Sequence, residues 1–238
     1  AESYLGRAVA AKILGTYKLS TDAHLTRYVN LIGRTVALGS DKPYTYGGYH
    51  FAVLDTPEIN AFAAPGGTIF ITAGMVRTTA NEDELAAVLA HEVAHIGKRD
   101  GIAAIKSARW TQALTLIGTT AAKNYTSSEI SQLVSIFEGS IDDVFKTLVV
   151  NGYGRSQEYA ADETAVMTLA RCGYDPKALV SFLKRLEQRG KSSGGGIMQT
   201  HPGTADRIDN ISGKIPATGA IHPRAIEART ARYNQSVR

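Results

Sequence analysis

The chain has 238 residues, a length at which one compact domain buries its core without disulfides, and we expect a single domain over 1–238. Its formal net charge is +4 with no block of five or six like charges, so we expect no nucleic-acid partner. No run of about 18 apolar residues occurs, which excludes a membrane-spanning helix in the chain as given.

The first 40 residues predict two helices. Residues 4–15 are rich in Ala and Leu, which favour helix. Thr21 or Asp22 can cap a second helix that runs to about residue 38.

A small sheet is expected within residues 49–73. The alternating stretch 49–54 and the run 68–72 are typical of strands. Between them, Asn60, Ala61 and Phe62 also have strand character. The edge of such a strand can pair with an extended peptide, although a hairpin wholly within the core fits the same pattern.

Beyond residue 81 the sequence predicts almost only helices. Periodic apolar stretches occur at 82–98, 102–122, 129–149, 155–171, 175–189 and 204–213. We expect catalytic helices within about 82–171 and a C-terminal helical part over 175–238. The Gly- and Ser-rich stretch 190–196 predicts a mobile loop. The fold class is therefore α+β, dominated by helices.

The helix near residue 90 contains the sequence HEVAH. Asn81 and Glu84 have the spacing of a capping box, so we expect this helix to begin at about residue 82. His91 and His95 are four residues apart and therefore lie one above the other, which lets both imidazoles bind one cation. Two satisfied core histidines are the alternative.

The same motif predicts zinc chemistry, with one Zn²⁺ per chain. Glu92 points toward the same open side as the two histidines. Zinc lowers the pKa of water to near neutrality, and a carboxylate beside it can take the proton as the water attacks a carbonyl. Glu92 is therefore the candidate general base.

A catalytic zinc site needs a third protein ligand. The metzincin spacing is absent, because Gly101 stands where that pattern has its third histidine. Downstream, Glu158 and Asp162 lie four apart on one predicted helix face. We predict Glu158 as the third ligand and Asp162 as the acceptor for the other nitrogen of one histidine. Surface ion pairs with Arg155 or Arg171 are the alternative for both carboxylates.

The order of these motifs resembles the M48 family of zinc metallopeptidases, which includes the Ste24 and HtpX proteases and soluble bacterial relatives. The matching blocks are NAFAAPGGTIFITAGMV, HEVAH, RSQEYAAD and THPGTADRI. The resemblance implies a gluzincin-like core with a small β-sheet bordering the active-site cleft. It assigns His91, His95 and Glu158 as zinc ligands, Glu92 as base and Asp162 as their support. Lack of spanning segments points to the soluble branch.

The last block adds two further candidate site residues, His201 and Arg207. In some soluble relatives the histidine matching His201 approaches the metal and occupies the position of the water, which would hold the enzyme inactive. An ordinary loop histidine is the alternative.

Arg207 can stabilise an oxyanion, hold a carboxylate in the cleft or form a structural salt bridge. Tyr159 and Tyr153 are further candidate oxyanion donors, with core packing as the alternative.

These motifs predict a zinc-dependent endopeptidase that cuts extended or misfolded proteins, with a role in cell-envelope quality control. The competing hypothesis is a latched or non-cleaving, zinc-containing chaperone for extended polypeptides, and a lesser one is hydrolysis of a non-protein amide. A removed leader before Ala1 would fit a periplasmic protein, a shortened chain fits equally, and a cytoplasmic location stays open.

The predicted helices 102–122 and 129–149 have no part in this chemistry. Trp110 and Leu114 are among their apolar residues. Core packing, a cover for the cleft, a subunit contact or peripheral membrane or lipoprotein-like association each fit these helices.

Overall fold

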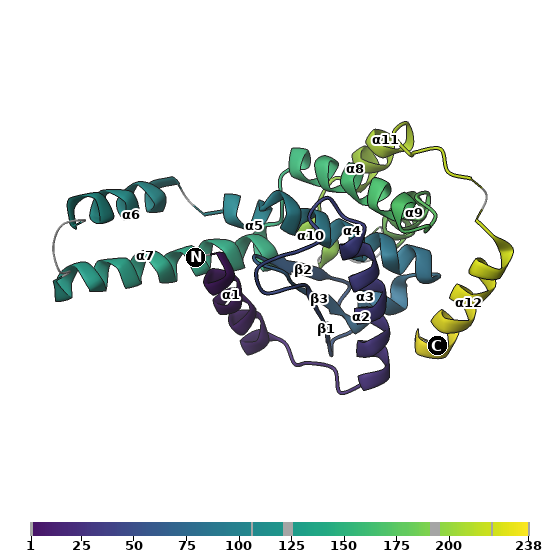
Figure 1. The fold of residues 1–238 in the computed structure, drawn as a ribbon, viewed down its shortest axis with the longest axis horizontal. Coiled ribbons are helices and arrows are strands. Elements are labelled where there is room, and N and C mark those ends of the chain that lie inside the picture. Colours follow the sequence, from purple (N-terminus) through teal and green to yellow (C-terminus); the bar gives the residue numbers. More distant parts are fainter. Residues whose placement is uncertain (1, 106, 121–125, 191–195, 220, 238) are drawn as a thin grey trace.

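Helices dominate the protein, and a small three-stranded sheet lies among them in the described part of the chain (Figure 1). This is the helix-dominated α+β class that the sequence predicts. The structure is a computed structural model that describes residues 2–105, 107–120, 126–190, 196–219 and 221–237. None of its described helices is long and apolar enough to cross a membrane.

The two N-terminal helices form as predicted. α1 (Glu2–Thr16) packs on the sheet and on a later helix, and α2 (Ala23–Leu38) packs on the first strand. Asp22 caps α2, because its side chain accepts a hydrogen bond of 2.9 Å from the backbone N–H of Leu25. α1 and α2 contribute to two different hydrophobic clusters, each of which includes residues of the sheet.

The sheet consists of β1 (His50–Leu54), β2 (Ala61–Ala64) and β3 (Thr68–Thr72) in the order β1-β3-β2. β1 runs parallel to β3, and β2 runs antiparallel to it. Gly66 and Gly67 both have positive φ angles, which allows the tight turn between β2 and β3. β2 is thus an edge strand, although its four residues are buried.

The helix with the HEVAH sequence has nearly the predicted limits. α4 (Glu82–Lys98) begins after Asn81, whose side chain accepts a 2.9 Å hydrogen bond from the N–H of Glu84. It ends where Arg99 adopts a left-handed conformation with φ of 61°. A short helix before it, α3 (Ala73–Thr78), was not predicted, because six residues are too few for a periodic pattern.

The region after α4 agrees in part with the predicted helices 102–122 and 129–149. It contains α5 (Asp100–Ala103), α6 (Ser107–Thr120), α7 (Ser127–Lys146) and a π-helical turn (Thr147–Asn151). α7 and the π-helical turn confirm the predicted helix 129–149. The predicted helix 102–122 is instead divided into α5 and α6, because apolar periodicity does not reveal where one helix ends, and it also does not reveal the widened turn that ends at Gly152. That glycine has φ of 78° and redirects the chain.

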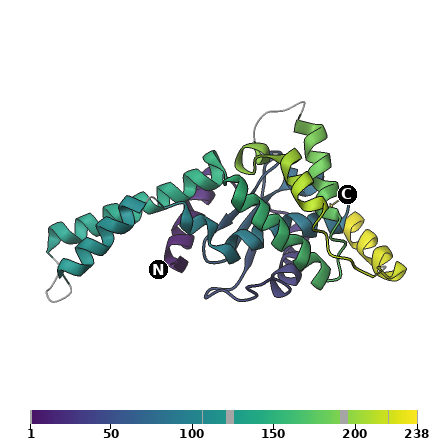
Figure 2. The same ribbon diagram turned by 90° about the horizontal axis from the view of Figure 1, so that it is seen from above.

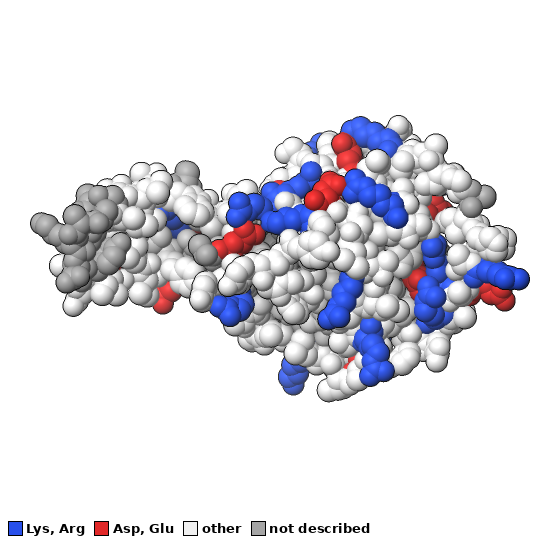
Figure 3. Space-filling view, viewed as in Figure 1, with Lys and Arg blue, Asp and Glu red and all other residues white. Residues whose placement is uncertain are grey.

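α6 and α7 form a hairpin that reaches away from the rest of the molecule in both views (Figures 1 and 2). It exposes large apolar side chains, namely Trp110, Leu114, Ile117, Ile130, Val134 and Phe137. On the face seen in Figure 3, the described part of the hairpin carries few charged atoms, whereas basic and acidic side chains are interspersed over the body. Core packing alone therefore does not account for these helices.

The remaining helices build the side of the molecule that faces α4. α8 (Arg155–Arg171) packs along α4 through small buried residues, including Ala161 and Ala165. It is followed by α9 (Ala178–Gly190), α10 (Ile197–Thr200), α11 (Thr204–Ser212) and α12 (Pro223–Val237). α10 and α12 lie within the predicted C-terminal helical part 175–238, although no periodic stretch singled them out. Most of the predicted mobile loop 190–196 lies outside the described residues.

Candidate metal centre

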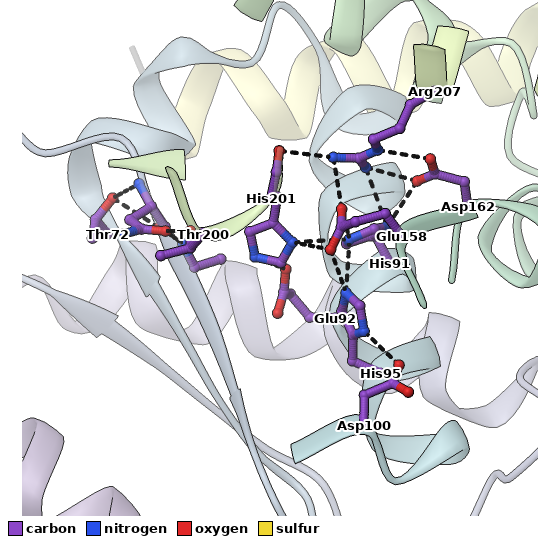
Figure 4. Close-up of polar contacts among 12 residues, drawn as sticks. Thr72, His91, Glu92, His95, Asp100, Glu158, Asp162, Thr200, His201 and Arg207 are labelled. Atoms are coloured by element: carbon purple, nitrogen blue, oxygen red, sulfur yellow. Dashed lines mark hydrogen bonds and ion pairs between the residues drawn. The ribbon is translucent and has the colours of Figure 1, made fainter. Parts of the chain in front are cut away.

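α4 carries three polar side chains that are buried together in the middle of the protein. His91, Glu92 and His95 are all less than 5% exposed. The Nε2 atoms of the two histidines lie 3.0 Å apart, so both imidazoles are aimed at one point (Figure 4). Buried polar groups require partners, and two imidazole nitrogens this close share a proton or a cation.

α8 brings a carboxylate to the same point. Glu158 is fully buried, and its Oε1 lies 3.4 Å from Nε2 of His95. Its Oε2 lies 3.5 Å from Nε2 of His91. The small residues between α4 and α8 allow this approach, because bulkier side chains would hold the two helices further apart.

His201 completes the group from the segment between α10 and α11. Its Nδ1 lies 3.2 Å from Nε2 of His91 and 3.0 Å from Oε1 of Glu158. One donor atom from each of His91, His95, Glu158 and His201 lies within 4.8 Å of the other three. The four donors come from three segments that are far apart in the sequence.

The spacing of these donors fits a tetrahedral zinc ion. Bonds of about 2.0–2.1 Å place the donors of a tetrahedron roughly 3.3 Å apart, and the separations described above run from 3.0 to 3.5 Å. The charged groups around the donors also favour a bound cation. Burial disfavours a charged imidazole, but the negative charge of Glu158 and a hydrogen bond that Asp162 accepts from the ring raise the pKa of His91 to about 10. The carboxylates around the imidazoles thus stabilise positive charge at this position.

Glu92 lies beside these four donors without belonging to them. Its Oε1 is 3.6 Å from Nε2 of His201, and its Oε2 is buried without a hydrogen-bond partner in the described structure. An unpaired buried carboxylate oxygen costs free energy unless a ligand or water completes it. This oxygen is therefore available to a molecule held beside the donor cluster.

Each α4 histidine has a carboxylate on its other ring nitrogen. Asp162 Oδ1 lies 2.9 Å from Nδ1 of His91, and Asp100 Oδ2 lies 2.7 Å from Nδ1 of His95. Such partners fix the tautomer that leaves Nε2 free for a metal. Asp100 was not predicted, although a carboxylate five residues after the second histidine, just beyond the end of α4, was a usable signal.

Arg207 binds the carboxylates of the centre. Its guanidinium makes two hydrogen bonds to Asp162, of 2.8 and 2.7 Å, and its Nη1 lies 2.8 Å from Oε2 of Glu158. Burial alone would raise the pKa of Glu158, but His201 and Arg207 hold that pKa well below its usual range. Of the three roles considered for Arg207, holding a carboxylate in the cleft is the one that this geometry favours.

Three of the other sequence candidates lie apart from the donors. Tyr159 is partly exposed on α8, and no contact among the described residues joins its hydroxyl to the cluster. As the neighbour of Glu158 it points about 100° away around the helix. Phe62 is buried and packs against Tyr17 at 5.5 Å between ring centroids. Ala61, next to it, pairs with β3.

Asn60 connects the sheet edge to the His201 segment. Its side-chain oxygen accepts a 3.0 Å hydrogen bond from the hydroxyl of Thr200, the residue before His201. The backbone N–H of Ile197 donates to the carbonyl of Ile59 at 2.8 Å. α10 is therefore fastened to the start of β2 while His201 lies among the donors.

A small apolar cavity opens beside His91, Glu92 and His201. Its walls include Met75, Val88, Leu179, Phe182, Leu183 and Leu186. The space is about 20 Å³, which holds one water molecule but no side chain. A larger ligand requires the cavity to open, and His201 forms part of its wall.

Comparison with known proteins identifies the family. The family model described as peptidase family M48 matches residues 23–215. The chain is 28% identical over 211 residues to the β-barrel assembly-enhancing protease of Yersinia pestis, covering 88% of this chain and 43% of that protein. The putative counterpart in Vibrio cholerae is 31% identical over 217 residues, with 87% and 42% covered.

A eukaryotic relative matches the same region. The mitochondrial metalloendopeptidase OMA1 of Schizosaccharomyces pombe is 29% identical over 168 residues, covering 69% of this chain and 46% of that protein. The chain thus spans less than half the length of these relatives. The match to the family model covers most of its residues, so the chain belongs to peptidase family M48, the zinc metallopeptidases that its motifs resemble.

Proposed function

We propose that this chain is a zinc-dependent endopeptidase that hydrolyses peptide bonds in extended or misfolded proteins. His91, His95 and Glu158 would hold the zinc, and Glu92 would act as general base. The observation that carries this proposal is the unpaired, buried Oε2 of Glu92 beside donors spaced for a tetrahedral zinc ion. A structural zinc site needs no such base.

Zinc, when bound, supplies a Lewis acid that polarises the scissile carbonyl and favours ionisation of water. Residues of this chain transfer the proton and hold the histidines in place. Glu92 accepts the proton of the attacking water at its free Oε2 and then donates it to the nitrogen of the leaving amine. Asp162 and Asp100 hold the two imidazoles in the required tautomer.

The substrate would enter along the sheet. We infer that an extended peptide pairs with the edge strand β2, where Asn60, Ala61 and Phe62 begin the strand, and that residues 1–238 form one peptidase domain around this cleft. The position of β2 at the edge of the sheet supports this pairing. Recognition through backbone hydrogen bonds depends little on sequence and favours unfolded segments.

The same proposal includes a location in the cell envelope. The names of two bacterial relatives refer to β-barrel assembly, which supports protein quality control there, in the periplasm, as the role of this chain. The exposed apolar side chains of the α6–α7 hairpin support peripheral contact with a membrane surface.

A second candidate is a latched or non-cleaving form that grips extended chains without cutting them. Nδ1 of His201 occupies a fourth donor position, which is the position that water needs in an active enzyme. The cavity beside it is also too small for a substrate side chain. Both observations favour a form that becomes active only when the His201 segment moves.

Replacing the base tests the peptidase proposal directly. In Glu92→Gln we expect zinc content and melting temperature to stay at wild-type values, while cleavage of casein falls by about 10²–10⁴-fold, the usual contribution of a general base. The exposed Glu227→Gln serves as the control and should cleave normally. Wild-type cleavage by Glu92→Gln would show that another group takes the proton.

Asp100 offers a separate test of the histidine supports. Removing its charge in Asp100→Asn weakens the hold on Nδ1 of His95, so the zinc dissociation constant should rise by about 10–100-fold. Competition with a zinc-sensitive dye measures this change. Asp209→Asn, at an exposed position, should leave the constant unaltered. Equal zinc affinity in all three proteins would remove Asp100 from the site.

His201→Ala separates the active enzyme from the latched form. A latch that opens in about 10% of molecules or fewer limits turnover to that fraction, so its removal should raise casein cleavage at least about tenfold. The exposed His222→Ala is the matched control. An unchanged rate would mean that His201 is not a latch, and zinc binding without cleavage in His201→Ala would favour the non-cleaving form.

A further inference from the structure

Tyr153, one of the two candidate tyrosines of the sequence, is buried at the centre without a polar partner for its hydroxyl among the described residues. Its side chain is only 5% exposed, and its hydroxyl makes no hydrogen bond within the described structure. A buried hydroxyl normally has a partner, because burial without one costs free energy. An unpaired hydroxyl beside an active centre is therefore a candidate for a ligand contact.

The ring of Tyr153 lies against the donor cluster. It stacks on the imidazole of His95 with 4.0 Å between centroids and an angle of 19°, and it lies 5.7 Å from the ring of His201. The backbone N–H of Tyr153 donates a 3.0 Å hydrogen bond to the carbonyl of Thr200. Tyr153 is thus held between one proposed zinc ligand and the proposed latch.

The local backbone is built to place this ring. The π-helical turn after α7 ends at Gly152, whose φ of 78° suits glycine. A Cβ atom there would lie 2.5 Å from the carbonyl oxygen of Gln199, so no other residue fits without displacing α10. The widened turn and the glycine together deliver Tyr153 to the centre rather than to the surface.

The surroundings keep the hydroxyl protonated. Burial and the negative charges of Glu92, Asp100 and Glu158 raise the pKa of Tyr153 well above its ordinary value. None of these carboxylates accepts its proton in the described structure, so the donor is free for another acceptor.

We propose that Tyr153 is a catalytic residue whose hydroxyl donates a hydrogen bond to the carbonyl oxygen of the scissile peptide bond as that oxygen gains negative charge. This inference rests on the proposed peptidase function. The two other candidates for this role are placed differently. Arg207 is engaged by Asp162 and Glu158, and Tyr159 points away from the donors. A preorganised donor in a dry site stabilises the transition state more than the bound substrate.

The test is Tyr153→Phe, which removes the hydroxyl and keeps the stack on His95. We expect kcat for a peptide substrate to fall by about 10²–10³-fold, the usual loss for one oxyanion donor, with little change in KM. Zinc content should stay the same, and the melting temperature of the zinc-free protein should not fall, because the lost hydroxyl has no partner. The measurements are made in wild type and in the His201→Ala background.

Tyr233→Phe is the matched control. Tyr233 is equally buried, but its hydroxyl donates to the carbonyl of Thr79, far from the centre. This variant should lower the melting temperature and leave kcat intact. The two substitutions thus predict opposite patterns for a catalytic and a structural hydroxyl.

Binding of a phosphinic peptide with leucine on both sides of the phosphinic group gives a readout without turnover. Its tetrahedral anionic oxygens mimic the transition state, so Tyr153→Phe should weaken its binding at least about tenfold in calorimetry. Unchanged kcat and unchanged phosphinic affinity would overturn the proposal, as would a lower melting temperature or lost zinc. Absence of cleavage by wild type and by His201→Ala would instead refute the peptidase function itself.

Discussion

The close packing of α4 on α8 is the contact on which the candidate centre depends. Alanines on both helices, including Ala90 and Ala161, let the two backbones approach until a carboxylate of one meets two imidazoles of the other. In this arrangement the carboxylate of Glu158 lies within 3.5 Å of both Nε2 atoms. Residues that carry no chemistry therefore set the geometry of those that do.

This packing removes several charges from water, and the protein compensates for each of them locally. Arg207 neutralises Glu158 and Asp162, while Asp162 and Asp100 each bind the outer nitrogen of one histidine. A buried charge is tolerated when it is paired and hydrogen-bonded. Among the buried polar atoms without a hydrogen-bond partner in the described structure are Oε2 of Glu92 and the hydroxyl of Tyr153, whose side chains lie beside the donor cluster. The proposed metal ligands thus have charged or hydrogen-bonding partners, whereas these two groups have none among the described residues.

Most of the correct predictions from the sequence rest on helical spacing and on capping residues. HEVAH, the cap at Asn81 and the run around Glu158 gave α4 and α8 almost to the residue, because these signals are local. The sequence did not reveal Asp100 as part of the centre, and it offered Tyr153 only as one of two candidate tyrosines. Each is placed by a backbone irregularity, the left-handed Arg99 or the turn at Gly152, that leaves no periodic pattern. The place of His201 depends on contacts between distant segments, and only the family resemblance suggested it.

Zinc content tests the central claim most directly. Mass spectrometry on the purified wild type should find about one zinc per chain, and Glu158→Ala should lose it while remaining folded by circular dichroism. Glu163→Ala, on the same helix but partly exposed, should keep the metal. Zinc retained at wild-type stoichiometry in Glu158→Ala, or no zinc in the wild type, would contradict the assignment of this cluster as the metal centre.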